Sequence, residues 1–86
     1  MNDRLKRLKF RAWHRGTREA DYMIGGFFDH YHASWGETEI AWFEIVCEED
    51  DVDIMAWAMN AGEPPAHLNN PDMIAAMRRL DYIPLP

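Results

Sequence analysis

The chain has 86 residues and a net charge of −6, which is enough for one small domain. A domain of this size buries only about 60–65% of its unfolded surface, so it cannot easily hold both a core and a large cofactor cavity. The composition, 48% apolar and 28% charged, is typical of a globular protein and excludes a disordered one. No apolar run approaches the roughly 18 residues of a membrane span. A lone cysteine and the lack of an apolar signal segment favour a reducing cytoplasm.

Apolar residues three and four positions apart predict two helices early in the chain, from about Asp3 to His14 and from Gly16 or Thr17 to Tyr31. Asp3 can cap the first helix. One face of that helix commits four side chains to packing: Leu5, Leu8, Ala12 and Trp13. The second helix carries a wider apolar stripe and is expected at the centre of the core.

Two adjacent glycines, Gly25 and Gly26, lie inside the second helix. Within a helix each glycine costs about 1 kcal/mol relative to alanine. We therefore expect a neighbouring helix to pack closely against both of them.

A third helix is expected from about Glu37 to Glu48, with four residues facing inward: Ile40, Phe43, Val46 and Cys47. The acidic run at residues 48–51 follows it. That run supplies a cap for a fourth helix, Asp50 or Asp51, and negative charges that favour the N-terminus of a helix.

The fourth helix, from about Val52 to Asn60, is apolar on nearly every side. A small bundle cannot cover every face of such a helix, so part of it should lie under a loop or face a partner. Trp57 is the first candidate. We predict that it is partly exposed beside a partner surface.

A fifth helix is expected after Asn70, which can cap it, with Pro71 as its first residue. Residues 81–86 then form a short tail. No segment alternates apolar and polar residues with a period of two. The sequence therefore predicts an all-α fold, a single-domain bundle of four to five short helices over residues 1–86.

The turn between the first two helices carries an unusual set of residues. Gly16 suits a reversal of the backbone, because glycine adopts positive φ and allows another backbone to approach closely. Arg15 offers a planar five-donor group suited to a carboxylate or phosphate. If Gly16 is also the N-cap of the second helix, Glu19 falls at the third helical position, near the positive helix end. The turn is thus either a plain connector or a surface that presents charged groups to a partner.

Charge is distributed unevenly along the chain. Residues 1–18 carry seven basic and one acidic side chain, a charge of +6, and residues 19–86 carry two basic and fourteen acidic ones, a charge of −12. A basic N-terminal helix is typical of nucleic-acid binding. Its apolar face is committed to packing, however, and the acidic remainder would repel phosphate, so we expect no nucleic-acid partner.

The sequence lacks the usual patterns of catalytic and metal sites. Cys47 lies on a core-facing stripe, and its neighbours Glu48 and Glu49 should raise the pKa of its thiol, so we interpret it as structural. His30 and His32 are two positions apart and point to different sides of a helix, which prevents them from gripping one metal ion. No phosphate loop or dinucleotide-binding glycine pattern is present. These residues alone indicate a small acidic module that binds another protein and is not an enzyme.

The turn also resembles a known signature. Residues 15–19, Arg-Gly-Thr-Arg-Glu, are similar to the RGxxE motif of the succinate dehydrogenase assembly factors, small proteins that promote covalent attachment of FAD to the flavoprotein subunit. Residues 27–30 resemble the FF(D/E)xx segment of that family, and residues 51–57 resemble its D-x-D-L-x-x-W segment. The resemblance covers about residues 4–62. Small residues stand where the family usually has larger ones, at Ala20 and at both helical glycines, but none of these departures touches the motif.

The resemblance implies a five-helix fold and a non-enzymatic role in assembly. The partner would be the flavoprotein subunit of succinate dehydrogenase, or that of fumarate reductase, with FAD attached there and not bound tightly by this chain. The resemblance places Arg15 and Gly16 at the contact. We add the charged residues beside this turn and Trp57 of the fourth helix. The predicted partner-binding residues are therefore Arg15, Gly16, Arg18, Glu19, Asp21 and Trp57. We expect a cytoplasmic monomer with no catalytic residues, no metal and no membrane contact.

Two other classes stay open. Some relatives have been labelled antitoxins, so an antitoxin-like or regulatory protein-binding module is one alternative. The other is a nucleic-acid module that uses the basic first helix. Protein-bound flavin measured under denaturing conditions tests the first, and a steep salt dependence of RNA or DNA binding would support the second.

Overall fold

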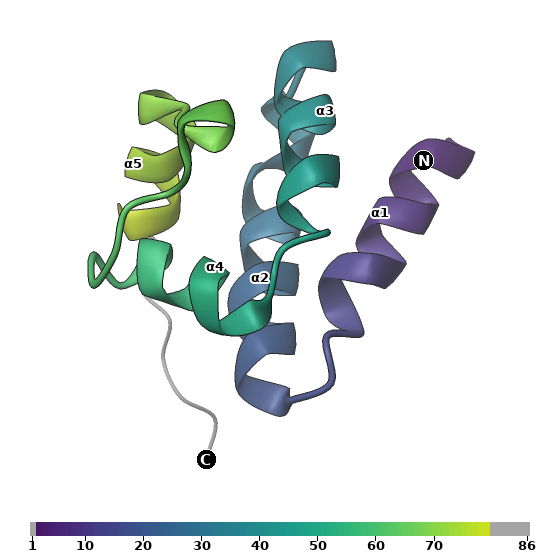
Figure 1. The fold of residues 1–86 in the computed structure, drawn as a ribbon. Coiled ribbons are helices and arrows are strands. Elements are labelled where there is room, and N and C mark those ends of the chain that lie inside the picture. Colours follow the sequence, from purple (N-terminus) through teal and green to yellow (C-terminus); the bar gives the residue numbers. More distant parts are fainter. Residues whose placement is uncertain (1, 80–86) are drawn as a thin grey trace.

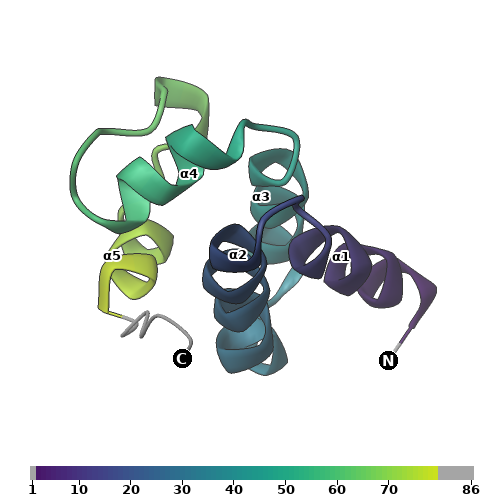
Figure 2. The same ribbon diagram turned by 90° about the horizontal axis from the view of Figure 1, so that it is seen from below.

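The computed structural model describes residues 2–79, so Leu80 and the predicted tail at residues 81–86 lie outside the described part. Within it the chain forms five α-helices and no strand, which confirms the predicted all-α fold. The helices are α1 (Asp3–Trp13), α2 (Arg18–Tyr31), α3 (Glu37–Val46), α4 (Asp51–Ala58) and α5 (Pro71–Arg79). Figures 1 and 2 show α2 in the middle, with α1 and α5 on opposite sides of it.

Side chains cap several of the helices within a residue or two of the predicted positions. Asn70 caps α5 as predicted, since its Oδ1 accepts the Met73 N–H at 3.2 Å. The predicted cap of α1 is wrong by one residue: Asn2 Oδ1 accepts the Leu5 N–H at 2.8 Å, and Asp3 is the first helical residue. The negative charge of Asp3 at this position stabilises α1, because the N-terminal end of a helix carries a partial positive charge.

The core is aromatic and centred on α2, as predicted. Phe27 and Phe28 of α2 and Phe43 of α3 are fully buried, and the Phe27 and Phe43 ring centroids lie 5.7 Å apart. Rings at such distances and tilts attract each other beyond the effect of their buried area. Trp42, which the sequence did not mark as inward-facing, is also buried, and its indole N–H donates to the Leu68 carbonyl at 2.8 Å.

The close packing expected at the two helical glycines occurs at Gly25 and not at Gly26. A Cβ added to Gly25 would overlap the Trp13 indole ring of α1, whereas a Cβ at Gly26 would meet no atom within 4 Å. Successive helical residues point about 100° apart, so one neighbouring helix can cover only one of them.

This difference predicts opposite effects of the same substitution. Gly25→Ala should lower the free energy of unfolding by about 1–3 kcal/mol, because the added methyl group overpacks against Trp13. Gly26→Ala should raise it by up to about 1 kcal/mol, because alanine is the better helix former and the space is open. Urea unfolding of both variants checks this. Equal effects of the two substitutions would contradict the packing described here.

Trp57 does not lie where the sequence predicted. Only 4% of it is exposed, so the expectation of a partly exposed side chain is wrong. The reason is that α4 packs against α2 and α5 through the face that carries Ile54, Trp57 and Ala58. A hydrogen bond also joins α4 to α5, since the Arg78 Nε–H of α5 donates to the Trp57 carbonyl at 2.8 Å.

Candidate partner-binding site

The turn between α1 and α2, residues 14–17, depends on its glycine. Gly16 has a φ of +113°, which L side chains rarely adopt, and a Cβ placed there would meet nothing within 4 Å. The predicted positive φ is therefore confirmed, and the glycine borders open space. Thr17 is the N-cap of α2, and its Oγ1 accepts the Ala20 N–H at 3.2 Å. The alternative in which Gly16 is the N-cap is wrong, so Glu19 is the second helical residue rather than the third.

The Arg15 side chain is bonded inside the molecule. Its Nε donates to Asp51 Oδ1 at 2.7 Å, its Nη1 to the Cys47 carbonyl at 2.6 Å and its Nη2 to the Glu49 carbonyl at 2.9 Å. Only 11% of the side chain is exposed. The planar arginine group thus joins the turn to the segment between α3 and α4, and three of its five N–H donors are used there.

The backbone of the turn is fixed as well. The Arg15 N–H donates to Asp21 Oδ1 at 2.5 Å, from the first turn of α2. Asp21 therefore fixes the backbone at the residue before Gly16, while Asp51 fixes the Arg15 side chain. Asp51 is not among the site residues predicted from the sequence. Its only signal in the sequence is an acidic side chain at the start of a distant helix, and several acids there fit that description equally well.

Arg18 and Glu19 differ from their neighbours in the turn. Both side chains are exposed, and neither forms a hydrogen bond or ion pair with another of residues 2–79. They lie at the start of α2, directly after Gly16. The turn therefore presents one basic and one acidic side chain beside an open glycine, on a backbone that is held from two sides.

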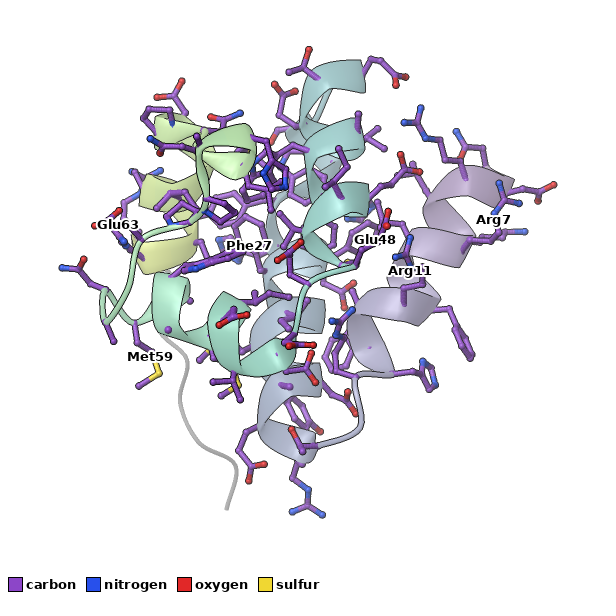
Figure 3. All side chains as sticks on the ribbon, viewed as in Figure 1. Arg7, Arg11, Phe27, Glu48, Met59 and Glu63 are labelled. Carbon is purple, nitrogen blue, oxygen red and sulfur yellow. The ribbon has the colours of Figure 1, made fainter. Side chains whose placement is uncertain are left out.

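Two of the five basic side chains of α1 form ion pairs within the described part of the chain. Arg4 donates to Glu44 at 2.7 and 2.9 Å and to Glu37 at 2.6 Å, and these hydrogen bonds lower the pKa of both glutamates. Lys9 lies 3.4 Å from Asp29. In Figure 3, Arg11 lies on the side of α1 that faces α3, and the charges of Arg11 and Arg7 also help to lower the pKa of Glu44. A pairing of this kind leaves fewer cations for phosphate than the composition of α1 indicates.

Cys47 is buried, which raises the pKa of its thiol to about 11. The direction agrees with the sequence prediction, but the main cause is burial and not the acids beside it in the chain. Arg15 and Arg11 act in the opposite direction without overcoming burial. Among residues 2–79, no three His, Cys, Asp or Glu side chains are grouped to hold a metal ion. No helix in the same range is long and apolar enough to cross a membrane.

These features define a class of protein: a small helical module that exposes a glycine-centred turn, which hydrogen bonds from Asp21 and Asp51 hold in place. The family model described as flavinator of succinate dehydrogenase matches residues 6–81, and the chain belongs to that family. No solved structure matches the chain.

Three relatives with the name FAD assembly factor SdhE show the degree of similarity. The chain is 38% identical over 53 residues to that of Pectobacterium atrosepticum, 41% over 54 residues to that of Acetobacter pasteurianus and 42% over 53 residues to that of Yersinia pseudotuberculosis. These alignments cover 62–63% of this chain. They span 60%, 50% and 60% of the respective relatives.

Proposed function

We propose that the chain binds the flavoprotein subunit of succinate dehydrogenase and promotes covalent attachment of FAD to that subunit, without itself being an enzyme. The observation that carries this proposal is the anchored turn at Gly16, which lies in the RGxxE motif of a chain that belongs to the flavinator family. The relatives named FAD assembly factor support the same role. The corresponding subunit of fumarate reductase is the second client to test.

Within this proposal the six predicted residues act in two ways. Gly16, Arg18 and Glu19 contact the partner, since they are exposed at the turn. Arg15, Asp21 and Trp57 are positioning residues. Two of them hold the turn through their hydrogen bonds, and Trp57 anchors α4 in the core.

The chain is proposed to act on FAD attachment in its partner and to bind no FAD tightly. The large aromatic side chains that would have to make room for an isoalloxazine ring, Phe27, Phe28 and Phe43, are instead packed against one another. We also propose that the chain works as a cytoplasmic monomer.

The proposal is tested by mixing the purified flavoprotein subunit without FAD, free FAD and this chain. After denaturation, the flavin fluorescence that stays with the subunit measures covalent attachment. We expect attachment to proceed faster with the chain than with an equal amount of an unrelated small helical protein. Equal rates would contradict the proposal, and tight binding with no gain in attachment would favour a regulatory binding module instead.

A further inference from the structure

α4 carries a second apolar face, beside the one that packs into the core. Val52 is 78% exposed and Met59 64% exposed, and Met55 lies between them, half-buried and packed in part against the core. Positions spaced by three and four residues share one side of a helix. We call these three residues the α4 stripe. Single exposed apolar residues are common on proteins, but here they align from the second residue of α4, Val52, to the residue just after its end, Met59.

α4 lies at the same end of the molecule as the Gly16 turn. Figure 1 shows α4 and the turn at the lower end, and both face the viewer in Figure 2. The Arg15–Asp51 hydrogen bond joins the turn to the first residue of α4, and Val52 is the next residue. In Figure 3, Met59 extends from the other end of α4, away from the body of the protein. A partner seated on the turn would therefore meet the stripe beside it.

Acidic side chains border the α4 stripe. Asp50 and Asp53 are exposed at the start of α4. Glu63 does not belong to this border, because it lies beside α5, 3.6 Å from Arg78 and apart from Met59 (Figure 3). The partner surface that best fits the stripe is therefore an apolar patch flanked by basic side chains, which would face Asp50 and Asp53.

A second copy of this chain fits the α4 stripe poorly. An eight-residue helix is about 12 Å long, and a standard protein interface buries about 800 Å² on each partner, which so short a stripe cannot supply alone. Two copies would also bring two acidic borders into one contact. The turn and the stripe together offer a larger and continuous surface.

We infer that Val52, Met55 and Met59 form a second part of the partner contact, continuous with the Gly16 turn, and that they cover an apolar patch flanked by Lys or Arg on the flavoprotein subunit. This inference rests on the proposed function. It assigns to the outer face of α4 the contact that the sequence analysis assigned to Trp57.

The test compares Val52→Ala/Met59→Ala with Ile45→Ala, a matched control that removes an exposed β-branched side chain, 43% exposed, from α3. Titration calorimetry with the purified flavoprotein subunit without FAD should show about tenfold weaker binding for the double variant, the scale of a contact near the centre of an interface. Ile45→Ala should change the affinity less than twofold. Melting curves of all variants should stay close to that of the unaltered chain, because the changed side chains are exposed. Asp53→Lys should weaken binding most at low salt.

The outcomes separate the inference from the proposed function. Unaltered affinity of Val52→Ala/Met59→Ala, alongside lost binding of Gly16→Glu, would overturn the α4 contact and leave the function standing. An equal loss for Ile45→Ala would also overturn it, because the effect would then not be confined to the stripe. If the unaltered chain itself fails to bind the subunit, the proposed function fails and the inference fails with it.

Discussion

Gly16→Glu is expected to abolish covalent flavin attachment to the partner subunit while the isolated chain stays folded. The space beside Gly16 is open, so the new side chain meets no atom of its own protein. Its backbone must still adopt a φ of +113°, which costs about 1–3 kcal/mol for a residue with a Cβ. The carboxylate would then lie where the partner backbone approaches. Flavin fluorescence after denaturation measures attachment, and a melting curve measures folding.

Gly16→Ala is the matched control for this prediction. It imposes the same backbone strain with the smallest possible side chain, so it should lower the melting temperature about as much as Gly16→Glu does. Attachment should largely survive in the alanine variant. If both variants support attachment equally well, the turn is only a connector. If both lose it equally while folded, the conformation of the turn matters and the bulk of the side chain at this position does not.

Arg15→Ala is expected to destabilise the folded chain as well as weaken partner binding. Two backbone carbonyls, those of Cys47 and Glu49, lose a charged donor, and Asp51 loses its cation. Partly buried groups left unsatisfied in this way should reduce the free energy of unfolding by about 2–4 kcal/mol in total. Arg15→Lys should restore only part of that loss, because a single ammonium group cannot reach three acceptors in one plane. Urea unfolding of both variants measures the effect.

A double-mutant cycle with Asp51 decides how Arg15 affects binding. If the arginine acts by holding the turn, Asp51→Ala should weaken partner binding too, and the double variant should bind about as well as Arg15→Ala alone. Effects of groups that act as one unit are not additive. Full affinity of Asp51→Ala together with lost binding of Arg15→Ala would show instead that the guanidinium contacts the partner directly. The same cycle on urea unfolding provides the control for stability.

The sequence predicts the helices well because each long helix shows its buried face through its own spacing. In α2 the apolar side chains recur every three or four residues, and this pattern alone places Phe27 and Phe28 in the core. α4 is different. It has eight residues and is apolar on nearly every side, so its composition cannot indicate which face turns inward. The prediction for Trp57 is wrong for that reason, and the sequence does not predict which other residues of α4, Val52 and Met59 among them, are exposed.

The contacts of the turn show a second limit on prediction from sequence. The positive φ at Gly16 follows from local chemistry, because glycine is the residue that adopts it readily. The acceptors of Arg15 do not follow from local chemistry, since they lie beyond the next two helices and two of them are backbone carbonyls. Any residue type can supply a carbonyl, so no motif marks them. Only the packing of α2 against its neighbours brings them to the arginine.

The long reach of the Arg15 side chain has a consequence for how the motif can be used. Its three acceptors lie 32, 34 and 36 residues further along the chain. A short synthetic peptide that spans the two ends of the turn would lack all of them, so it should compete poorly with the whole domain for the same client. Grafting the five motif letters onto another helical hairpin should fail for the same reason. A molecule whose α3–α4 segment has been clipped or has failed to fold would lose the recognition surface, so only intact copies would engage the client.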